Sequence, residues 1–206
     1  MGKHSQSIDT LILRRISSRG AGRVFTASDF HDLGSRDAVD QALSRHARAG
    51  AIRKLARGLY DLPRRDPLLG PLLPSVDAIA DALRGRDAVR LQPTGAYAAN
   101  LLGLSDQVPM RIVFLTDGIA RQVRIGKQQI VLKRTTPRNM ATAGRVSGLV
   151  IQGLRHLGRQ GVHDQVVDVL RSRLSADDKR QLLRDVRLAP AWVADVMRQV
   201  AAEPGS

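Results

Sequence analysis

The sequence contains no cysteine, which excludes disulfides, thiolate metal ligands and cysteine nucleophiles. Aromatic residues make up only 3% of the chain, which argues against an RNA-binding platform that stacks bases on several exposed rings. No apolar run is long enough to span a bilayer, and residues 1–10 lack the apolar core of a signal peptide. We therefore expect a cytoplasmic protein without a membrane partner.

Glutamate is almost absent as well, since Glu203 is the only one. The 206 residues carry 33 Lys and Arg against 19 Asp and Glu, a net charge of +14. Residues 1–74 and residues 75–206 are each net positive, by +6 and +8. Such an excess favours a polyanionic partner, because each phosphate neutralised by a cation releases counterions. A general compositional bias toward arginine is the alternative interpretation of the charge.

Residues 1–66 have the element order of a winged helix-turn-helix. Apolar spacing predicts a helix over residues 5–17, and Val24–Phe25 predicts a very short strand. A short helix is expected after Thr26, with Asp29 completing a capping box and Gly34 ending it. The third helix starts from Ser35 as N-cap and ends at Gly50, and a hairpin over residues 52–63 follows.

In a winged helix-turn-helix the third helix enters the major groove of DNA, so its outward side chains would read bases. Gln41, Ser44, Arg45 and Arg48 fall on one stripe of this helix. Their chemistry suits base edges, because Arg pairs with guanine, Gln with adenine, and Ser with either. Arg36, near the helix start, would lie against a phosphate or the first base. A solvated polar face, which every surface helix has, is the alternative.

The hairpin IRKLARGLYDLP (residues 52–63) is the predicted wing. It begins two residues after the helix ends, and we expect Arg53, Lys54 and Arg57 to cluster at its tip and contact the DNA backbone or minor groove. Gly58 can take the left-handed conformation that a short turn requires. Because the apolar alternation is imperfect, a β-bulge is expected.

The rest of the chain predicts a second, mixed domain. Residues 63–74 carry four prolines, so we expect neither helix nor strand there and assign residues 67–74 as a linker. In residues 75–206, a helix from Ser75, a strand over residues 88–92 and a strand with hairpin over residues 111–135 precede a helical C-terminus. The expected fold class is α+β: an N-terminal winged helix-turn-helix followed by a mixed α/β domain with a helical C-terminal tail.

Five short motifs resemble motifs of a known family and occur in the same order along the chain. RGLYDLP, PTGAYAANLLGLSDQVP, IVFLTDG, LRHLG and PAWVADV are similar to those of antitoxins from bacterial abortive-infection (AbiE-type) toxin–antitoxin systems, the AbiEi-like transcriptional regulators. The resemblance implies that the winged domain binds double-stranded operator DNA and represses its own operon. It also implies that residues 75–206 counteract a nucleotidyltransferase-like toxin.

Two other functions stay open at this point. One is a winged-helix transcriptional regulator whose C-terminal domain senses a ligand or dimerises, with no toxin partner. The other is a nucleic-acid-processing enzyme, for which Asp117 with Lys127 and Lys133 is the only candidate set, and it lacks a second carboxylate. His156 and His163 are seven residues apart, which is not the spacing of a helical metal pair. We therefore expect no catalytic residues, cofactor or metal.

Overall fold

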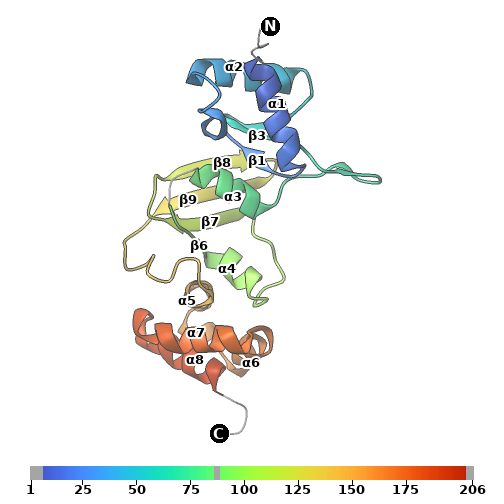
Figure 1. Ribbon diagram of the computed structural model, residues 1–206. Coiled ribbons are helices and arrows are strands. Elements are labelled where there is room, and N and C mark those ends of the chain that lie inside the picture. The colour runs from blue at the N-terminus through green and yellow to red at the C-terminus, as the bar shows by residue number, and fades with distance from the viewer. Residues whose placement is uncertain (1–6, 86–88, 203–206) are drawn as a thin grey trace. The chain divides into compact units, whose positions relative to one another are not determined.

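The protein has a mixed α+β fold, and the computed structural model describes residues 7–85 and 89–202 (Figure 1). The chain divides into two compact units, Met1–Ala88 and Val89–Ser206, and each is described by itself. The division falls later than expected, because residues 67–74 lie within the first unit. In the described ranges, no helix has the length and apolar character needed to cross a membrane.

The first unit contains, in its described part, three α-helices, one short 3-10 helix and five short strands. In chain order these are α1 (Ile8–Arg19), β1 (Val24–Phe25), η1 (Ala27–Phe30), α2 (Arg36–Arg48), β2 (Arg53–Ala56), β3 (Leu59–Asp61), β4 (Arg65–Asp66), β5 (Gly70–Pro71) and α3 (Val76–Arg84). Strands β1, β3 and β2 form an antiparallel sheet with β3 in the middle. The helix predicted over residues 5–17 is α1, although residues 5 and 6 lie outside the described ranges.

Serine and threonine start these helices because their side chains accept backbone N–H groups that have no partner within the helix. Ser35 accepts from the amide of Ala38, and Ser75 accepts from the amide of Ala78. Thr26 and Asp29 form the predicted capping box. The short helix ends at Phe30 rather than at Gly34, because it is a 3-10 helix, a form that rarely exceeds one turn.

Side chains of α1 and η1 pack together and support α2. Ile12 and Phe30 are fully buried in one apolar cluster with Val39 and Leu43 of α2. Arg15 crosses from α1 to Asp32 with two hydrogen bonds of 2.7 Å, and its guanidinium lies 6.0 Å from the Phe30 ring centre. The charged end of Arg15 thus covers the core that its neighbours build.

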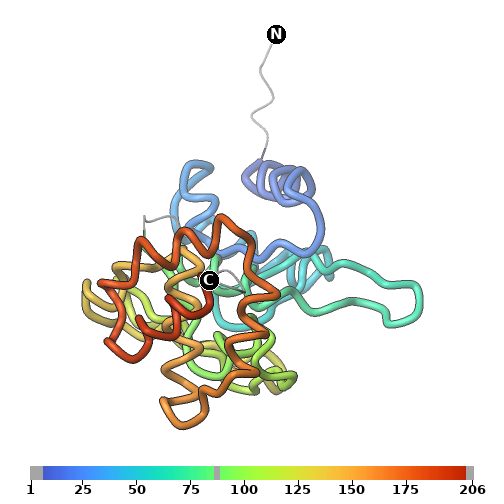
Figure 2. The backbone as a smooth tube through the Cα atoms, turned by 90° about the horizontal axis from the view of Figure 1, so that it is seen from below, coloured from blue at the N-terminus to red at the C-terminus, as the bar shows by residue number. Residues whose placement is uncertain are grey.

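The proline-rich segment is not free of strands, contrary to the sequence prediction. Arg65 pairs with Pro71 and Asp66 with Gly70, which makes β4 and β5 a small antiparallel hairpin. Both strands of a two-stranded hairpin are edge strands. Proline fits in such a strand because an N–H that points away from the partner strand is not needed for pairing. The hairpin extends away from the rest of the first unit in both views (Figures 1 and 2), and Leu68 in its turn is 94% exposed.

The second unit consists of a four-stranded sheet and a set of helices. In chain order they are β6 (Leu91–Thr94), α4 (Gly95–Leu101), β7 (Arg111–Thr116), β8 (Arg121–Ile125), β9 (Gln128–Arg134), α5 (Val146–Leu157), η2 (Arg159–Gly161), α6 (Asp164–Arg173), α7 (Ala176–Asp185), η3 (Val186–Leu188) and α8 (Ala191–Ala201). The strand order is β6-β7-β9-β8, and only β7 and β9 are parallel. The predicted strand, hairpin and helical C-terminus are therefore confirmed.

Strand β6 is shifted toward the C-terminus relative to the prediction over residues 88–92, and Ala88 lies outside the described residues. The strand includes Pro93, opposite Phe114 of β7. Since β6 is an edge strand, proline can occupy it without removing a hydrogen bond between two inner strands. A proline in the sequence is therefore a poor guide to the end of this strand.

Helix α5 links the sheet to the C-terminal helices. Gly153 lies against α4, where an added Cβ would be 2.7 Å from Cδ1 of Leu102. One apolar cluster joins α5 to the three helices that follow it. Its fully buried members include one residue each from α5, α6, α7 and α8: Leu154, Leu170, Leu182 and Met197. The helical tail predicted from the sequence is thus a packed part of the second unit.

A buried carboxylate joins the start of α5 to the end of α7. Asp185 is 4% exposed and accepts hydrogen bonds from Ser147, Arg145 and Gln181, the first at 2.5 Å. Burial acts to raise the pKa of Asp185, but the hydrogen bonds from Ser147 and Gln181 and the charge of Arg145 outweigh it, so the pKa is lowered. Asp185 is therefore a charged structural group.

Candidate nucleic-acid interface

The outward face of α2 presents polar and cationic side chains. Gln41, Arg45 and Arg48 are exposed, and Ser44 is half-buried. On the opposite side Val39 and Leu43 are fully buried, as the 3.6-residue spacing requires. The predicted stripe is thus brought together on one face. Arg36 is 82% exposed at the start of the helix, where its Nε lies 3.9 Å from Asp40.

Arg45 differs from its neighbours because it is held by α1. Its Nη2 donates to both carboxylate oxygens of Asp9, at 3.0 and 2.8 Å. Nε2 of His46 lies 3.3 Å from the same carboxylate but lacks the geometry of a hydrogen bond. The hydrogen bond from Arg45 is the largest influence on Asp9 and lowers its pKa. An acidic side chain therefore lies beside the cationic face of α2.

The hairpin of β2 and β3 has the expected bulge, because its register shifts between Lys54 and Ala56. Gly58 in the turn has φ +70°, the left-handed conformation that glycine adopts without strain. Leu59 is 2% exposed and anchors the returning strand. The hairpin follows α2 closely, since the amides of Ala51 and Ile52 both donate to the carbonyl of His46.

Arg53 is not at the tip of this hairpin, which corrects the sequence prediction. It is the first residue of β2 and pairs with Asp61, the last residue of β3. Its guanidinium donates to the two carboxylate oxygens of Asp61 at 2.9 and 2.6 Å, and to the carbonyl of Leu72 at 2.7 Å. Asp61 is fully buried, and its hydrogen bond raises the pKa of Arg53. Arg53 is thus a structural cation at the base of the hairpin.

Lys54 and Arg57 are the cations that remain exposed nearer the turn. The side chain of neither forms a hydrogen bond or ion pair with any residue in the described ranges. Sequence reasoning missed the acidic residues Asp9 and Asp61, which hold Arg45 and Arg53. The Arg53–Asp61 pair could have been found, because a two-stranded hairpin around Gly58 brings the two ends of the hairpin together.

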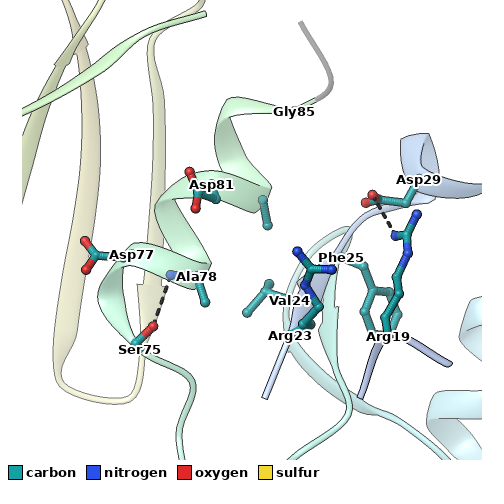
Figure 3. Close-up of a pocket in the computed structure, with 11 residues that line it drawn as sticks. Arg19, Arg23, Val24, Phe25, Asp29, Ser75, Asp77, Ala78, Asp81 and Gly85 are labelled. Atoms are coloured by element: carbon teal, nitrogen blue, oxygen red, sulfur yellow. Dashed lines mark hydrogen bonds and ion pairs between the residues drawn. The ribbon is translucent and has the colours of Figure 1, made fainter. Parts of the chain in front are cut away.

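A pocket in the first unit is lined by side chains of both charges. Its volume is about 530 Å³, and it lies between α3 and the end of α1 with β1 (Figure 3). Arg19 pairs with Asp29 at 3.1 Å on one wall, and Asp77 and Asp81 on α3 contribute further carboxylates. This balance of charges does not favour a polyanion, so the face of α2 and the hairpin is the better candidate for nucleic acid.

Asp117, the carboxylate of the candidate catalytic set with Lys127 and Lys133, is engaged in a contact with Arg90. Asp117 accepts hydrogen bonds of 2.9 Å from the backbone amide and the Nε of Arg90, and these lower its pKa. The guanidinium of Arg90 also donates to the carbonyl of Met140. Asp117 therefore joins two loops. Within residues 7–85 and 89–202, no group of three or more His, Asp or Glu side chains could hold a metal ion.

Comparison with known proteins assigns the chain to a family. Residues 11–182 match the model of a family of unknown function, DUF6088, so the match spans parts of both units. A search of curated proteins found no match to the chain. Since the match covers most of its length, the chain belongs to the DUF6088 family.

Proposed function

We propose that the first unit is a winged helix-turn-helix that binds operator DNA through α2 and the β2–β3 hairpin. We further propose that the whole chain is the antitoxin and autorepressor of an AbiE-type toxin–antitoxin system. In this account the second unit counteracts a nucleotidyltransferase-like toxin. The protein is a DNA-binding regulator with no catalytic step of its own, and it counteracts the toxin either by binding it or by acting on the toxin's target.

The observation that carries the DNA-binding proposal is the combination of topology and charge in the first unit. Helix α2 is followed directly by the β2–β3 hairpin. Strand β1 pairs with the edge of β3 that faces away from β2, which gives the sheet order β1-β3-β2. A winged helix has this arrangement, with the helix before the hairpin as the one that reads DNA.

The side chains on that face have the chemistry that DNA requires. Arg48 and Gln41 are exposed on α2, and arginine and glutamine can each make two hydrogen bonds to a single base. Arg36 is exposed at the helix start, where phosphates are commonly bound. Lys54 and Arg57 on the hairpin extend the cationic surface and suit sequence-independent contacts with the backbone.

The antitoxin part of the proposal rests on the ordered motifs. PTGAYAANLLGLSDQVP covers the end of β6 and the whole of α4, IVFLTDG covers most of β7, and PAWVADV covers the start of α8. These segments all belong to the second unit. LRHLG also lies in the second unit, whereas RGLYDLP lies in the hairpin of the first. Four of the five motifs are therefore in a different unit from the cationic α2, which is compatible with a division of labour between toxin and operator.

The DNA-binding half is tested with the DNA upstream of the gene itself. The purified full chain should retard this DNA in a mobility-shift experiment in the presence of excess unrelated duplex. Half-maximal binding at the same protein concentration for both DNAs would contradict operator recognition. The Arg48→Ala variant should bind the upstream DNA less tightly, and Arg198→Ala, the same change on α8, should not.

The antitoxin half is tested through the neighbouring gene. A nucleotidyltransferase-like neighbour should arrest bacterial growth when expressed alone, and co-expression of this chain should restore growth. Absence of such a neighbour, or arrest that persists despite co-expression, would contradict the antitoxin role. Neither result affects the DNA-binding proposal, because that proposal depends on residues of the first unit alone.

A further inference from the structure

A pocket of about 240 Å³ lies within the second unit, where three segments meet. The connection from β9 to α5 contributes Arg138 and Asn139, and α5 contributes Gln152 and Arg155. Leu188 and Pro190, on either side of the step from η3 to α8, complete the wall. All three segments belong to one compact unit, so the pocket is formed within that unit alone.

The charges around this pocket are of one sign. Its described lining contains two arginines and no carboxylate, whereas the pocket beside α3 combines arginines with three aspartates. Arg138 and Arg155 are both exposed, and the side chain of neither has a hydrogen bond or ion pair with a described residue. In contrast, the nearby Arg145 is paired with the buried Asp185 at 3.0 Å. Two unneutralised guanidinium groups therefore border one small cavity.

Gln152 adds a hydrogen-bond donor from the buried side. It is 7% exposed, and its Oε1 accepts a hydrogen bond of 2.8 Å from Oγ1 of Thr94. With the carbonyl oxygen engaged in this way, the group that the amide has left to offer is its NH₂ donor. Pro190 is the N-cap of α8, whose first turn holds no acidic residue, so the partial positive charge of that helix end adds to the same field.

We propose that this pocket binds a phosphate group, with Arg138 and Arg155 as the charged donors and Gln152 as a neutral donor. Guanidinium groups bind phosphate oxygens through two parallel hydrogen bonds, and these charge-assisted bonds are stronger than neutral ones. The pocket is smaller than the roughly 300 Å³ at which sites for drug-sized ligands begin, so it fits one or two phosphates rather than a whole nucleotide.

This inference does not depend on DNA binding by the first unit, and it adds a ligand site to the second. A free phosphate or diphosphate would make the second unit a sensor of small anions. A phosphate of a DNA backbone would make it an additional contact with nucleic acid. The chemistry at the pocket is the same in the two cases, and the experiment distinguishes them.

The test has two arms and uses the full chain. In the first, inorganic diphosphate is titrated into the protein in a calorimeter at low salt. In the second, affinity for the DNA upstream of the gene is measured across a range of salt concentrations. The variant in both arms carries Arg138→Gln together with Arg155→Gln. Its matched control carries Arg121→Gln together with Arg124→Gln, two exposed arginines on β8 that do not line the pocket.

Binding of free anions predicts saturable diphosphate binding that the double variant weakens by about tenfold or more and the control leaves unchanged. Binding of backbone phosphate predicts instead that the double variant reduces the slope of log K for DNA against log [salt] by about the amount expected for two phosphate contacts. If the double variant changes neither quantity, the pocket is not a phosphate site. Circular dichroism checks that the variant is folded, and a double Arg→Lys variant should retain part of the binding because it keeps both charges.

Discussion

The guanidinium of Arg53 forms hydrogen bonds with both carboxylate oxygens of Asp61, at 2.9 and 2.6 Å, and Asp61 is fully buried. This pair closes the base of the hairpin, where β2 begins and β3 ends. Arg53 also donates to the carbonyl of Leu72, which follows the β4–β5 hairpin. The cation nearest to α2 in the hairpin sequence is therefore a structural residue, and its removal should affect stability before it affects DNA.

Replacing Arg53 with alanine should destabilise the first unit strongly. The change leaves the buried carboxylate of Asp61 without its partner, and loss of one member of a buried pair costs about 3–5 kcal/mol. Because Arg53 is itself 26% exposed, we expect the lower end of this range. Urea unfolding measures the effect, and Arg57→Ala in the same hairpin is the control. Equal stability of the two variants would refute the structural role of Arg53.

Asp9→Asn should increase affinity for DNA. The substitution removes a negative charge beside α2 and releases Arg45, which Asp9 holds at 2.8 Å. The stability cost should be at most about 1 kcal/mol, because the two side chains are 36% and 49% exposed. DNA affinity at two salt concentrations is the measurement, with Asp164→Asn, also in the first turn of a helix but on α6 of the second unit, as the control. Unchanged or weaker binding by Asp9→Asn would contradict a role for Arg45 at the interface.

Asp185 should make the stability of the second unit depend on pH at the acidic end. Its pKa is lower in the folded protein than in the unfolded chain, so its contribution is fully present above the unfolded pKa of an aspartate. That contribution is lost as the pH falls below this value and through the folded pKa. Asp185→Asn should cost about 1.5–3 kcal/mol at pH 7, the range for hydrogen bonds to a charged group, and less near pH 3.

Urea unfolding of wild type and Asp185→Asn at the two pH values measures this difference. The control is Asp195→Asn on α8, where the carboxylate is 68% exposed and pairs with Arg198 in the same helix. A cost for Asp185→Asn that is as large at pH 3 as at pH 7 would mean that the charge of Asp185 is not the stabilising feature.

Gly148→Ala should destabilise the second unit for a steric reason. A Cβ at this position would overlap the backbone carbonyl oxygen of Thr142 and the side-chain amide of Gln92. Since a backbone atom cannot rotate away, the start of α5 would have to move, at a cost of about 1–3 kcal/mol. Gly161→Ala is the control, because its Cβ would lie 3.4 Å from that of Leu157. Thermal unfolding that is equal for the two variants would rule out this close approach.

Local chemistry made much of the fold predictable. Ser35, Ser75 and the Thr26–Asp29 box start elements where the sequence indicated, because capping depends on neighbours a few residues apart. The bulge and the turn at Gly58 were predictable for the same reason. The α+β class followed from the alternation of helical and strand periods along the chain.

Features that depend on pairing between distant residues were harder to predict. The position of Arg53 in the hairpin depends on the register of β2 with β3, and the restraint on Arg45 depends on how α1 packs against α2. The β4–β5 hairpin forms despite its prolines because Asp66 accepts the amides of Leu68 and Leu69 in the turn. Sequence spacing alone does not contain these contacts.

The most direct test of the central claim measures DNA affinity of the full chain as a function of salt, for wild type and three kinds of variant. Arg48→Ala should cost about 1–3 kcal/mol on the upstream DNA and much less on unrelated duplex, because it removes a base contact. Lys54→Ala and Arg57→Ala should weaken binding to both DNAs. Each should also reduce the slope of log K against log [salt] by about the amount expected for one phosphate contact. Arg198→Ala, on α8, should change neither. If the Arg48, Lys54 and Arg57 variants all bind as wild type does, α2 and the hairpin are not the DNA-binding surface.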